Sequence, residues 1–436
     1  MIDGITGGKT TYAYDAVGSL MGARYEDGTD DYRMPDAVGN VFRSRDRSDR
    51  EYGSGGRILR DKYYDYLYDV EGNLILKTPR RGLTRHPNHE VSEEVGTHIA
   101  WQTGDYAYEW YGNGMLKEVR LPYGKTVRFE YDALGRRTAK LFNGHVFRYL
   151  WDGNVMVQEW QYDENARPQH SIDEFGRIRM LGDEPVENLV TWVYEEGSYV
   201  PVAKIQDGER YTIISDYMGR PVEAYNSYGA IVWQADYDIY GDLRNRKGIR
   251  DFIPFRQLGQ YEDDETGLYY NRFRYYDPRT GNYISQDPIR LMGNNPTLYG
   301  YVEDLNKWTD LFGLKGGGSY SSVRGSNIGG EVHHTPANSI NGLSHGEGPS
   351  IWMETTDHRM TSSHGWQGKE GALYRQKQLD LINQGKFADA IQMDIDDIRS
   401  SFGSKYDSSI NEMLDYSHEK GLISKAERDK MKICTK

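Results

Sequence analysis

The stretch FEYDALGRRTAKL, Phe129 to Leu141, decides the fold because it contains a complete hairpin signature. Apolar and polar residues alternate on both sides of a short Asp-x-x-Gly segment, and a period of two is typical of a strand with one buried face. The Asp and Gly are typical turn residues, since Asp binds nearby backbone amides and Gly tolerates positive φ. The stretch therefore predicts two antiparallel strands joined by a tight turn.

Related phrases recur along the first part of the chain. They are YAYDAVGSL from Tyr12, PDAVGNVF from Pro35, YLYDVEGNLIL from Tyr66, YEWYGNGMLKEV from Tyr108 and DYDIYGDLR from Asp236. The copy at Tyr108 keeps the glycines but lacks the Asp. Several neighbouring copies lie about twenty residues apart, and such units stabilise one another only by stacking. The repeats predict a long antiparallel sheet built hairpin by hairpin.

Composition and charge narrow the class of protein further. The chain has 36 tyrosines and 49 glycines, which the repeats explain. A net charge of -13 argues against a general nucleic-acid-coating protein, although a local basic site is still allowed. The single cysteine, Cys434, excludes a disulfide framework and a Cys-ligated zinc site. We find no signal-peptide pattern and no apolar run of membrane-spanning length, so any export is expected to use a dedicated secretion system.

The repeat pattern changes between residues 259 and 314. This segment begins GQYEDDETGLYYNRFRYYDPRTGNY. With the repeats before it, this block resembles the YD repeats and repeat-associated core of bacterial Rhs proteins. The resemblance implies a mainly β protein with an antiparallel YD-repeat shell, part of a hollow cocoon, over residues 1–258 and the core over 259–314. A variable toxin would follow. The Gly/Ser-rich residues 315–330 predict a linker, which leaves 331–436 as the C-terminal toxin domain.

The resemblance also implies a setting in interbacterial competition. Rhs proteins of this type are made in the bacterial cytoplasm, commonly exported by type VI secretion, and act in the cytoplasm of a rival cell. The implied partners are a type VI spike or adaptor and a cognate immunity protein in the producing cell. Because no signal peptide is found, we expect delivery without the general secretory route.

Two aspartates near the end of the core form a candidate self-cleavage site. The Rhs core ends with two DPxGL motifs whose aspartates are associated with autoproteolysis after the second. Here the segments are DPIRL from Asp287 and DLFGL from Asp310, with the same separation. The resemblance implies that these aspartates cut the chain between Leu314 and Lys315. Two close carboxylates do not both ionise easily, so one can serve as base and the other as acid.

Two departures from the motif keep an alternative open. Arg290 replaces the family's Gly, and Leu311 replaces its Pro. A guanidinium beside the pair would favour two ionised carboxylates, which works against a shared proton. In the alternative, both aspartates are turn or helix-cap residues without chemistry.

Six of the eleven histidines lie after residue 314, and GEVHHTPANS places two of them side by side. On a strand, His333 and His334 would face opposite sides. The segment resembles HNH and endonuclease VII-like toxin domains with paired histidines. The resemblance implies a small α+β, ββα-metal-like, helix-rich domain, in which PSIWMETT is the second strand and DHRMTSSHG starts the helix. Apolar spacing from Gly371 onward predicts three or four further short helices.

The resemblance implies a role for each candidate residue in a metal-dependent endonuclease, and we favour DNA over RNA as its target. His334 would be the general base, with His333 exchanging roles if the pair is reversed. The ion would be held by His333 and His358, helped by Asp357 or His364, and Arg359 would contact phosphate. Imidazole and carboxylate ligands suit Zn, Ni, Mn or Mg, so the identity of the divalent metal ion stays open. The Asn that orients the base in HNH sites has no clear counterpart; Ser350 and Asn338 are nearest in position.

Other interpretations remain at this point. The histidines could stabilise a zinc fold without catalysis or bind no metal, and His345 and His418 are typical of solvated histidines. Asp394, Asp396 and Asp397 could bind a second metal or form an acidic surface. A local basic strip could comprise Arg324, Arg359, Lys369 and Arg375. The competing functions are a toxin of another chemistry and a non-enzymatic YD-repeat shell or surface protein.

Overall fold

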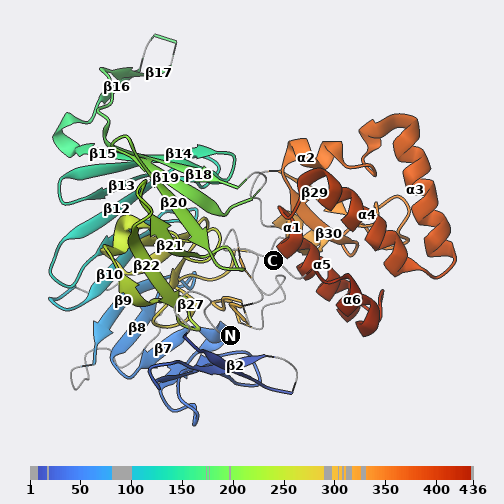
Figure 1. Ribbon diagram of the computed structural model, residues 1–436, viewed down its shortest axis with the longest axis horizontal. Coiled ribbons are helices and arrows are strands. Elements are labelled where there is room, and N and C mark those ends of the chain that lie inside the picture. Colours follow the sequence, from blue (N-terminus) through green and yellow to red (C-terminus); the bar gives the residue numbers. More distant parts are fainter. Residues whose placement is uncertain are drawn as a thin grey trace.

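The computed structural model describes residues 8–433 except 17–18, 81–100, 173, 176, 196–197, 289–296, 303, 307–308, 311–316 and 326–329. Two bodies stand side by side in it, a large curved β-sheet structure and a smaller helical domain (Figure 1). Strands dominate as far as Tyr283, and helices dominate from Tyr320 onward. Among the described residues, we find no helix with the length and apolar character needed to cross a membrane.

The strands of the first body are short, and most follow one another directly. They are β1 (Thr11–Tyr14), β2 (Leu20–Arg24), β3 (Asp30–Tyr32), β4 (Met34–Pro35), β5 (Val41–Phe42), β6 (Arg50–Tyr52), β7 (Ile58–Asp61), β8 (Tyr64–Tyr68), β9 (Leu74–Pro79), β10 (Tyr106–Trp110), β11 (Leu116–Arg120), β12 (Thr126–Tyr131), β13 (Arg137–Phe142), β14 (His145–Asp152), β15 (Val155–Asp163), β16 (Gln169–Ile172), β17 (Ile178–Leu181), β18 (Glu187–Tyr194), β19 (Pro201–Gln206), β20 (Glu209–Ser215), β21 (Pro221–Tyr225), β22 (Ile231–Tyr237), β23 (Leu243–Lys247), β24 (Tyr261–Asp263), β25 (Leu268–Asn271), β26 (Arg274–Asp277) and β27 (Asn282–Tyr283). Short 3-10 turns lie at Ser54–Gly56, Glu164–Ala166 and Arg250–Phe252.

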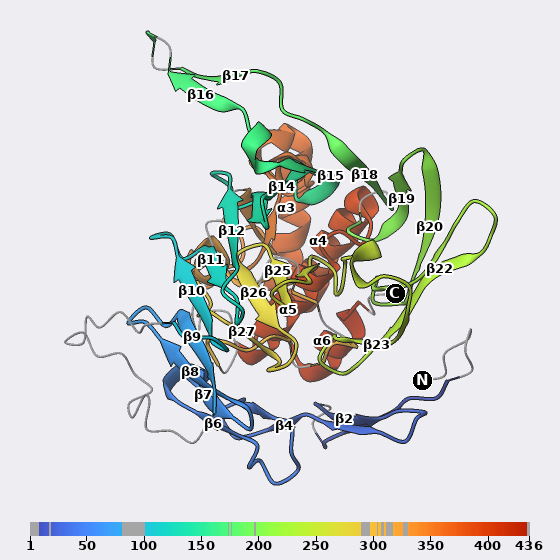
Figure 2. The same ribbon diagram turned by 90° about the vertical axis from the view of Figure 1, so that its left-hand side faces the viewer.

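Sixteen of these strands form one antiparallel sheet in sequence order, from β6 at one edge to β23 at the other. Only β16 and β17 interrupt the order, as a separate hairpin that projects from the sheet (Figure 1). This arrangement agrees with the predicted sheet of stacked hairpins. The sheet bends into an arc, and the four-stranded sheet β24 to β27 lies on its concave side (Figure 2).

The stretch that predicts the hairpin forms β12, a tight turn and β13. Asp132 Oδ1 accepts hydrogen bonds from the backbone N–H groups of Leu134 (2.9 Å) and Arg136 (2.8 Å). Gly135 has a φ of 72°, a left-handed conformation that glycine adopts without steric cost. The same pair of hydrogen bonds recurs at Asp36, Asp216, Asn226 and Asp238. The copies at 216 and 226 extend the repeat beyond those recognised from sequence.

Tyrosines and buried ion pairs join the core segment to the arc. Tyr270 and Tyr275 belong to one buried cluster with apolar side chains of β8 to β12. Arg137 Nη1 of the arc contacts Asp263 Oδ2 of the core at 2.5 Å, and both side chains are buried. A second buried pair joins Lys77 to Asp277 at 3.1 Å. These pairs fix the register of the core against the sheet.

The C-terminal body combines a small sheet with helices. Its elements are β28 (Gly317–Ser319), α1 (Tyr320–Gly325), β29 (Glu331–His334), β30 (Pro349–Met353), α2 (Thr355–Met360), the 3-10 turn η5 (Gly365–Gln367), α3 (Gly368–Asn383), α4 (Phe387–Phe402), α5 (Asp407–Glu419) and α6 (Lys425–Met431). The strand order is β28-β30-β29, and all pairs are antiparallel. Helices occupy the region where the apolar spacing predicts them.

The predicted linker over residues 315–330 is wrong for 317–325. Gly317 to Ser319 pair with Pro349 to Ile351 as the edge strand of the small sheet, and α1 follows at once. Gly317 is there for close packing, because a Cβ at this position would lie 1.9 Å from Ser409 O of α5. The glycine-rich sequence predicts a linker, whereas in the structure it permits a strand to approach a helix closely.

The two bodies touch through a small mixed interface. Tyr199 and Phe273 of the first body pack against the apolar cluster of the C-terminal body. Asn154 Nδ2 donates to Glu354 Oε1 at 3.4 Å, just before α2. The C-terminal body therefore docks on the first body through contacts of its own, in addition to the chain connection.

Replacing Arg137 with Ala is expected to destabilise the first body strongly. Among the described residues, the change leaves the buried Asp263 carboxylate with Lys140 (3.4 Å) as its one ion-pair partner, and removing one partner of a buried pair costs about 3–5 kcal/mol. We expect a clear fall in the urea midpoint measured by tryptophan fluorescence. Lys117→Ala, which breaks the exposed pair with Glu109, is the matched control and should change the midpoint little. Equal midpoints for the two variants would contradict this account.

Candidate functional site

Strand β29 carries the paired histidines, and they face opposite sides of the small sheet as alternation requires. His333 is opposite Ile351, and its ring lies 5.2 Å from that of His358. His334 is opposite Ser350, and its ring stacks on that of Tyr320 at 4.3 Å. One short strand therefore supplies side chains to two separate environments.

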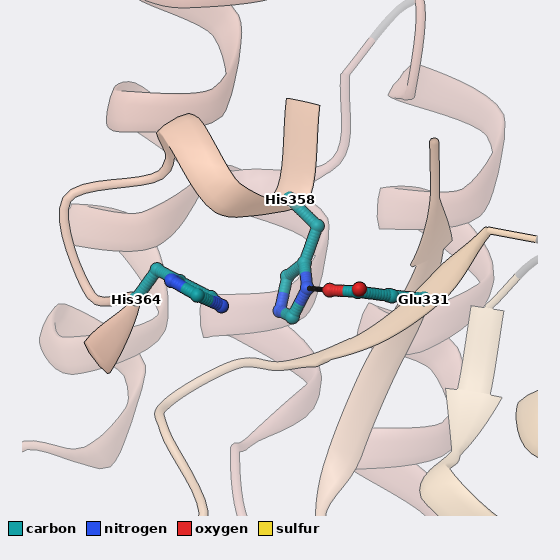
Figure 3. A group of neighbouring side chains, drawn as sticks. All are labelled: Glu331, His358 and His364. Carbon is teal, nitrogen blue, oxygen red and sulfur yellow. Dashed lines mark hydrogen bonds and ion pairs between the residues drawn. The ribbon is translucent and has the colours of Figure 1, made fainter. Parts of the chain in front are cut away.

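On the His333 side, three further residues meet. Glu331, His358 and His364 each present a potential ligand atom, and these atoms lie within 4.8 Å of one another. Figure 3 shows the His364 ring pointing toward His358, while His358 faces Glu331. His358 Nδ1 lies 2.5 Å from Glu331 Oε2, and we assign the hydrogen bond as donated by the imidazole. We refer to Glu331, His333, His358 and His364 as the histidine cluster.

Glu331 was missed in the sequence, although a signal was present. Glu331 and His333 are two residues apart on a strand, so they share a face. Two hydrogen bonds from Arg359, Nε at 3.1 Å and Nη2 at 2.7 Å, reach Glu331 Oε1. Burial acts to raise the pKa of Glu331, but the hydrogen bonds from His358 and Arg359 outweigh it and hold that pKa below its usual range. The carboxylate is thus kept as an anion next to His358.

The imidazole of His333 has the features expected of a ligand. Its side chain is 3% exposed, and among the described residues its Nε2 has no hydrogen-bond partner. Burial lowers the pKa of His333 well below its ordinary value, and the neighbouring imidazoles of His358 and His334 lower it further. A buried nitrogen without a partner costs free energy, which coordination of an ion would recover. The lone pair of neutral His333 and the nearby His358 and His364 make a donor set that fits a divalent metal ion.

Asp357 does not face the histidine cluster, contrary to the prediction from sequence. Its Oδ2 accepts hydrogen bonds from Lys405 Nζ at 2.8 Å and from the Tyr406 hydroxyl at 2.7 Å. Adjacent residues on a helix point about 100° apart, so α2 can present either Asp357 or His358 to the cluster, but not both. Arg359 is also engaged, since it holds Glu331 and its guanidinium carbon lies 4.5 Å above the centre of the Trp366 ring.

His334 belongs to a cluster of three rings. Its Nε2 is 3.0 Å from the backbone carbonyl of His345, and its buried ring packs against those of Tyr320 and His345, which also contact each other. A carbonyl only accepts, so Nε2 carries the proton and Nδ1 carries the lone pair. Burial lowers the pKa of His334, which keeps this imidazole neutral. Ser350, which lies opposite His334, does not orient the His334 ring, because its hydroxyl donates to Gly348 O at 3.1 Å. The His345 carbonyl orients that ring instead.

The three aspartates of the predicted acidic cluster on α4, Asp394, Asp396 and Asp397, have different surroundings. Asp397 accepts hydrogen bonds from the backbone N–H (2.8 Å) and hydroxyl (2.5 Å) of Ser362, and so holds the loop that carries His364. Arg375 Nη1 supports the same loop by donating to Ser363 O at 2.8 Å. Asp396 accepts from Gln392 at 2.8 Å on the exposed side of the helix. Arg375 therefore has a structural role in holding this loop.

Asp394, the third member, is fully buried between α3 and α4. Tyr374 and Gln378 of α3 are its polar neighbours, yet neither of its oxygens has a well-formed hydrogen bond among the described residues. Burial raises the pKa of Asp394 to about 7. Among the described residues, Asp394 belongs to no group of three potential metal ligands, and its carboxyl group lies in the packing between the two helices.

The candidate self-cleavage aspartates come together deep in the core. Arg274 Nη2 lies 2.9 Å from Asp287 Oδ2 and 3.2 Å from Asp310 Oδ2, and all three side chains are buried. The Tyr283 hydroxyl donates to Asp310 Oδ2 at 2.8 Å. Arg274 and Tyr283 were missed in the sequence because their strand positions carry no motif of their own.

Other parts of this prediction lie outside the described residues. These are the expected cut between Leu314 and Lys315 and the two departures from the motif, Arg290 and Leu311. His418, near the end of α5, is not among the grouped potential ligands of the described residues, and its Nδ1 lies 3.2 Å from Ile423 O.

Comparison with known proteins identifies the family to which the first body belongs. The family model described as Teneurin YD-shell matches residues 5–301. Double-stranded DNA deaminase toxin A of Burkholderia cenocepacia (strain H111) is 30% identical over 328 residues, which covers 71% of this chain and 21% of that protein. Probable deoxyribonuclease RhsA of Dickeya dadantii (strain 3937) is 27% identical over 419 residues, which covers 87% of this chain and 26% of that protein.

The chain spans about a quarter of the length of these curated relatives. Among solved structures, the crystal structure of TcdB2-TccC3-Cdc42 matches with a TM-score of 0.42 and 17% identity, and the match covers 70% of this chain and 17% of that chain.

Asp394→Asn is expected to change how stability depends on pH. The native pKa is about 7 and that of an unfolded Asp is about 3.9, so the native state binds more protons between these values. Stability therefore falls as pH rises from about 4 to about 7, and the loss is complete above that window. Asparagine stays neutral, so the variant should be the more stable protein at pH 8 and similar to the wild type near pH 4.

Thermal unfolding at pH 4.5 and pH 8, followed by far-ultraviolet circular dichroism, would measure the change. Asp396→Asn, an exposed position on the same helix, is the control. If the difference in Tm between Asp394→Asn and wild type is the same at both pH values, the buried carboxyl does not titrate as stated.

Proposed function

Because this chain belongs to the Teneurin YD-shell family, we propose that it is the shell and toxin portion of an Rhs-type interbacterial toxin whose C-terminal domain is a metal-dependent nuclease. One observation carries the proposal: Glu331, His358 and His364 present potential ligand atoms within 4.8 Å of one another, the His333 ring lies 5.2 Å from that of His358, and the neutral imidazole of His334 lies on the other face of β29. A ligand set beside a neutral imidazole is the minimum that metal-assisted phosphodiester hydrolysis requires.

We propose that His333, His358 and His364 hold the ion and that Glu331 orients His358. The hydrogen bond from His358 Nδ1 to Glu331 leaves Nε2 of that ring with its lone pair, an arrangement common around metal-ligating histidines. When bound, a divalent ion acts as a Lewis acid that stabilises negative charge on a phosphate. An imidazole-rich set suits Zn²⁺, Ni²⁺ or Mn²⁺ better than Mg²⁺.

His334 supplies the general base in this proposal. Its Nδ1 takes a proton from the water that attacks phosphorus, and the His345 carbonyl keeps the other nitrogen protonated. The stack with Tyr320 holds the ring in one orientation, so the basic nitrogen does not need to be positioned when substrate arrives. Arg359 completes the site by holding Glu331 at the edge of the histidine cluster.

The relatives support a nuclease at the level of their names. The alignment with probable deoxyribonuclease RhsA spans a larger share of this chain than residues 1–314 make up, so it includes part of the C-terminal domain. The alignment with the deaminase toxin covers a share that the shell and core can account for alone. We therefore favour DNA as the substrate, with RNA as the alternative.

The export route, the site of action and the immunity protein are proposed from the same relatives. One of them is Toxin protein Tse5 of Pseudomonas aeruginosa, which is 29% identical over 318 residues. We propose that this protein is exported by a type VI spike or its adaptor and acts in the cytoplasm of a target cell. We further propose that a cognate immunity protein protects the producer.

The test of the nuclease is cutting of nucleic acid by the purified chain. Plasmid DNA, single-stranded DNA and total RNA are incubated with Mn²⁺, Ni²⁺, Zn²⁺, Mg²⁺ or EDTA. We expect metal-dependent cutting that EDTA abolishes and that His334→Ala slows by about 10²- to 10⁴-fold, the usual contribution of a general base.

His145→Ala, which changes an exposed histidine of the shell, is the matched control and should cut like the wild type. Calorimetric titration with Mn²⁺ adds a readout that does not depend on cutting, and His333→Ala should weaken that binding while His145→Ala does not. A folded wild-type chain that binds metal but leaves every nucleic acid intact would exclude the nuclease.

We also propose that Asp287 and Asp310 hydrolyse the bond between Leu314 and Lys315. The observation in its favour is that both carboxylates contact Arg274 in one buried site although they are far apart in sequence. Because this guanidinium favours two ionised carboxylates, the pair shares no proton beforehand, and one carboxylate takes the proton from the attacking water. In the reaction, water adds to the carbonyl carbon of Leu314, the C–N bond breaks, and the amine of Lys315 takes the proton. The two carboxylates would move these protons, with Tyr283 and Arg274 fixing their positions.

Self-cleavage can be checked by intact mass and amino-terminal sequencing of the purified chain. We expect a C-terminal fragment that begins at Lys315, and we expect Asp310→Asn and Asp287→Asn each to leave the chain uncut. Asp264→Asn, at an exposed aspartate of the same core, is the control and should cleave normally. A wild-type chain that stays uncut, or fragments that persist in both Asn variants, would contradict the assignment.

A further inference from the structure

A solvent-exposed tryptophan lies directly beside the histidine cluster. Trp366, in the 3-10 turn before α3, is 72% exposed. Its ring centre lies 5.6 Å from that of His364, and its backbone N–H donates to His364 Nδ1 at 3.2 Å. A large aromatic ring so exposed has no role in the core, so its position next to the cluster needs another explanation.

The ring is nevertheless held in a fixed place. The guanidinium of Arg359 lies over it, 4.5 Å from the ring centre, and Arg359 is itself held by two hydrogen bonds to Glu331. Glu331 contacts His358, and Trp366 contacts His364, so these five residues form a closed ring of contacts. Arg359 covers part of the indole, and its exposure leaves a flat aromatic surface open to solvent beside the proposed reaction centre.

We propose that Trp366 is a stacking platform for an unpaired nucleobase next to the scissile phosphate, so the C-terminal domain selects single-stranded or locally opened nucleic acid. This inference rests on the proposed nuclease function and names its substrate class. Bases in a duplex are already stacked on their neighbours and cannot lie flat on a protein ring, whereas an unpaired base can. Lys369, the exposed second residue of α3, supplies the positive charge that the adjacent phosphate requires.

Binding of short oligonucleotides tests the platform apart from catalysis. The full chain carrying His334→Ala is used, so that cutting does not consume the probe, and Mn²⁺ is present throughout. The probes are fluorescein-labelled twelve-nucleotide DNA and RNA strands, the matching DNA duplex, and a strand of the same length with abasic sugars. Fluorescence anisotropy gives the Kd for each pair.

We expect adding Trp366→Ala to weaken binding of the single strands by about 5- to 150-fold, the usual range for loss of one base stack. Trp366→Phe should retain most of the affinity because it keeps a flat ring, whereas Trp366→Leu should behave like the Ala variant. Duplex and abasic strands should bind equally to all variants. Tyr228→Ala, at a shell tyrosine that is even more exposed, is the matched control and should bind like its parent.

Three results would overturn the platform. The first is unchanged single-strand affinity in Trp366→Ala. The second is an equal loss for the abasic strand, which would mean that Trp366 supports a phosphate contact. The third is full affinity in Trp366→Leu, which would mark an apolar docking surface such as one for an immunity protein. DNA and RNA strands separate the two possible sources of the base.

The nuclease and the platform can fail independently. If the wild-type chain cuts nothing but Trp366→Ala still loses single-strand affinity, the platform stands and the nuclease falls. If the wild-type chain cuts and Trp366→Ala binds and cuts single strands equally well, the platform falls and the nuclease stands.

Discussion

The first body depends on one local interaction, the hydrogen bonds that an Asp or Asn side chain makes to the backbone at a strand reversal. At Asp132 the two amides that would otherwise be left without partners in the turn both donate to one carboxylate oxygen. The glycine that follows supplies the positive φ that other residues adopt only with strain. Because the same turn recurs along the chain, a sixteen-stranded sheet forms from contacts between neighbours in sequence.

Tyrosine is the residue that makes such a sheet cohesive. Tyr131 donates its hydroxyl to Leu116 O at 2.8 Å, Tyr194 to Met156 O at 2.8 Å, and Tyr237 to Pro221 O at 2.7 Å, each across to another strand. The ring fills the space between strands, and the hydroxyl satisfies a carbonyl. Burial raises the pKa of Tyr131, Tyr194 and Tyr237, so all three stay protonated and remain donors. A chain rich in Tyr and Gly is therefore the composition that this architecture requires.

The sequence predicted what depends on local pattern and missed what depends on contacts between distant segments. The hairpins and the opposite orientation of His333 and His334 follow from a period of two, and both are present. Glu331 could have been found by the same rule. The role of Arg274 could not, because its two aspartate partners are brought to it by the fold. The prediction of a linker was wrong because the close approach of Gly317 to α5 cannot be recognised from a local sequence pattern.

Glu331 connects the parts of the site that the sequence treated separately. Its carboxylate binds His358 through one oxygen and Arg359 through the other, so the orientation of a ligand and the position of a cation depend on the same group. Asp357, the carboxylate first expected near the ion, instead ties α2 to Lys405 and Tyr406. The charge of Glu331 also offsets that of Arg359, which lets a guanidinium lie close to the three histidines. The histidine cluster, which we propose as the metal site, is therefore organised around this carboxylate, because it orients His358 and holds Arg359.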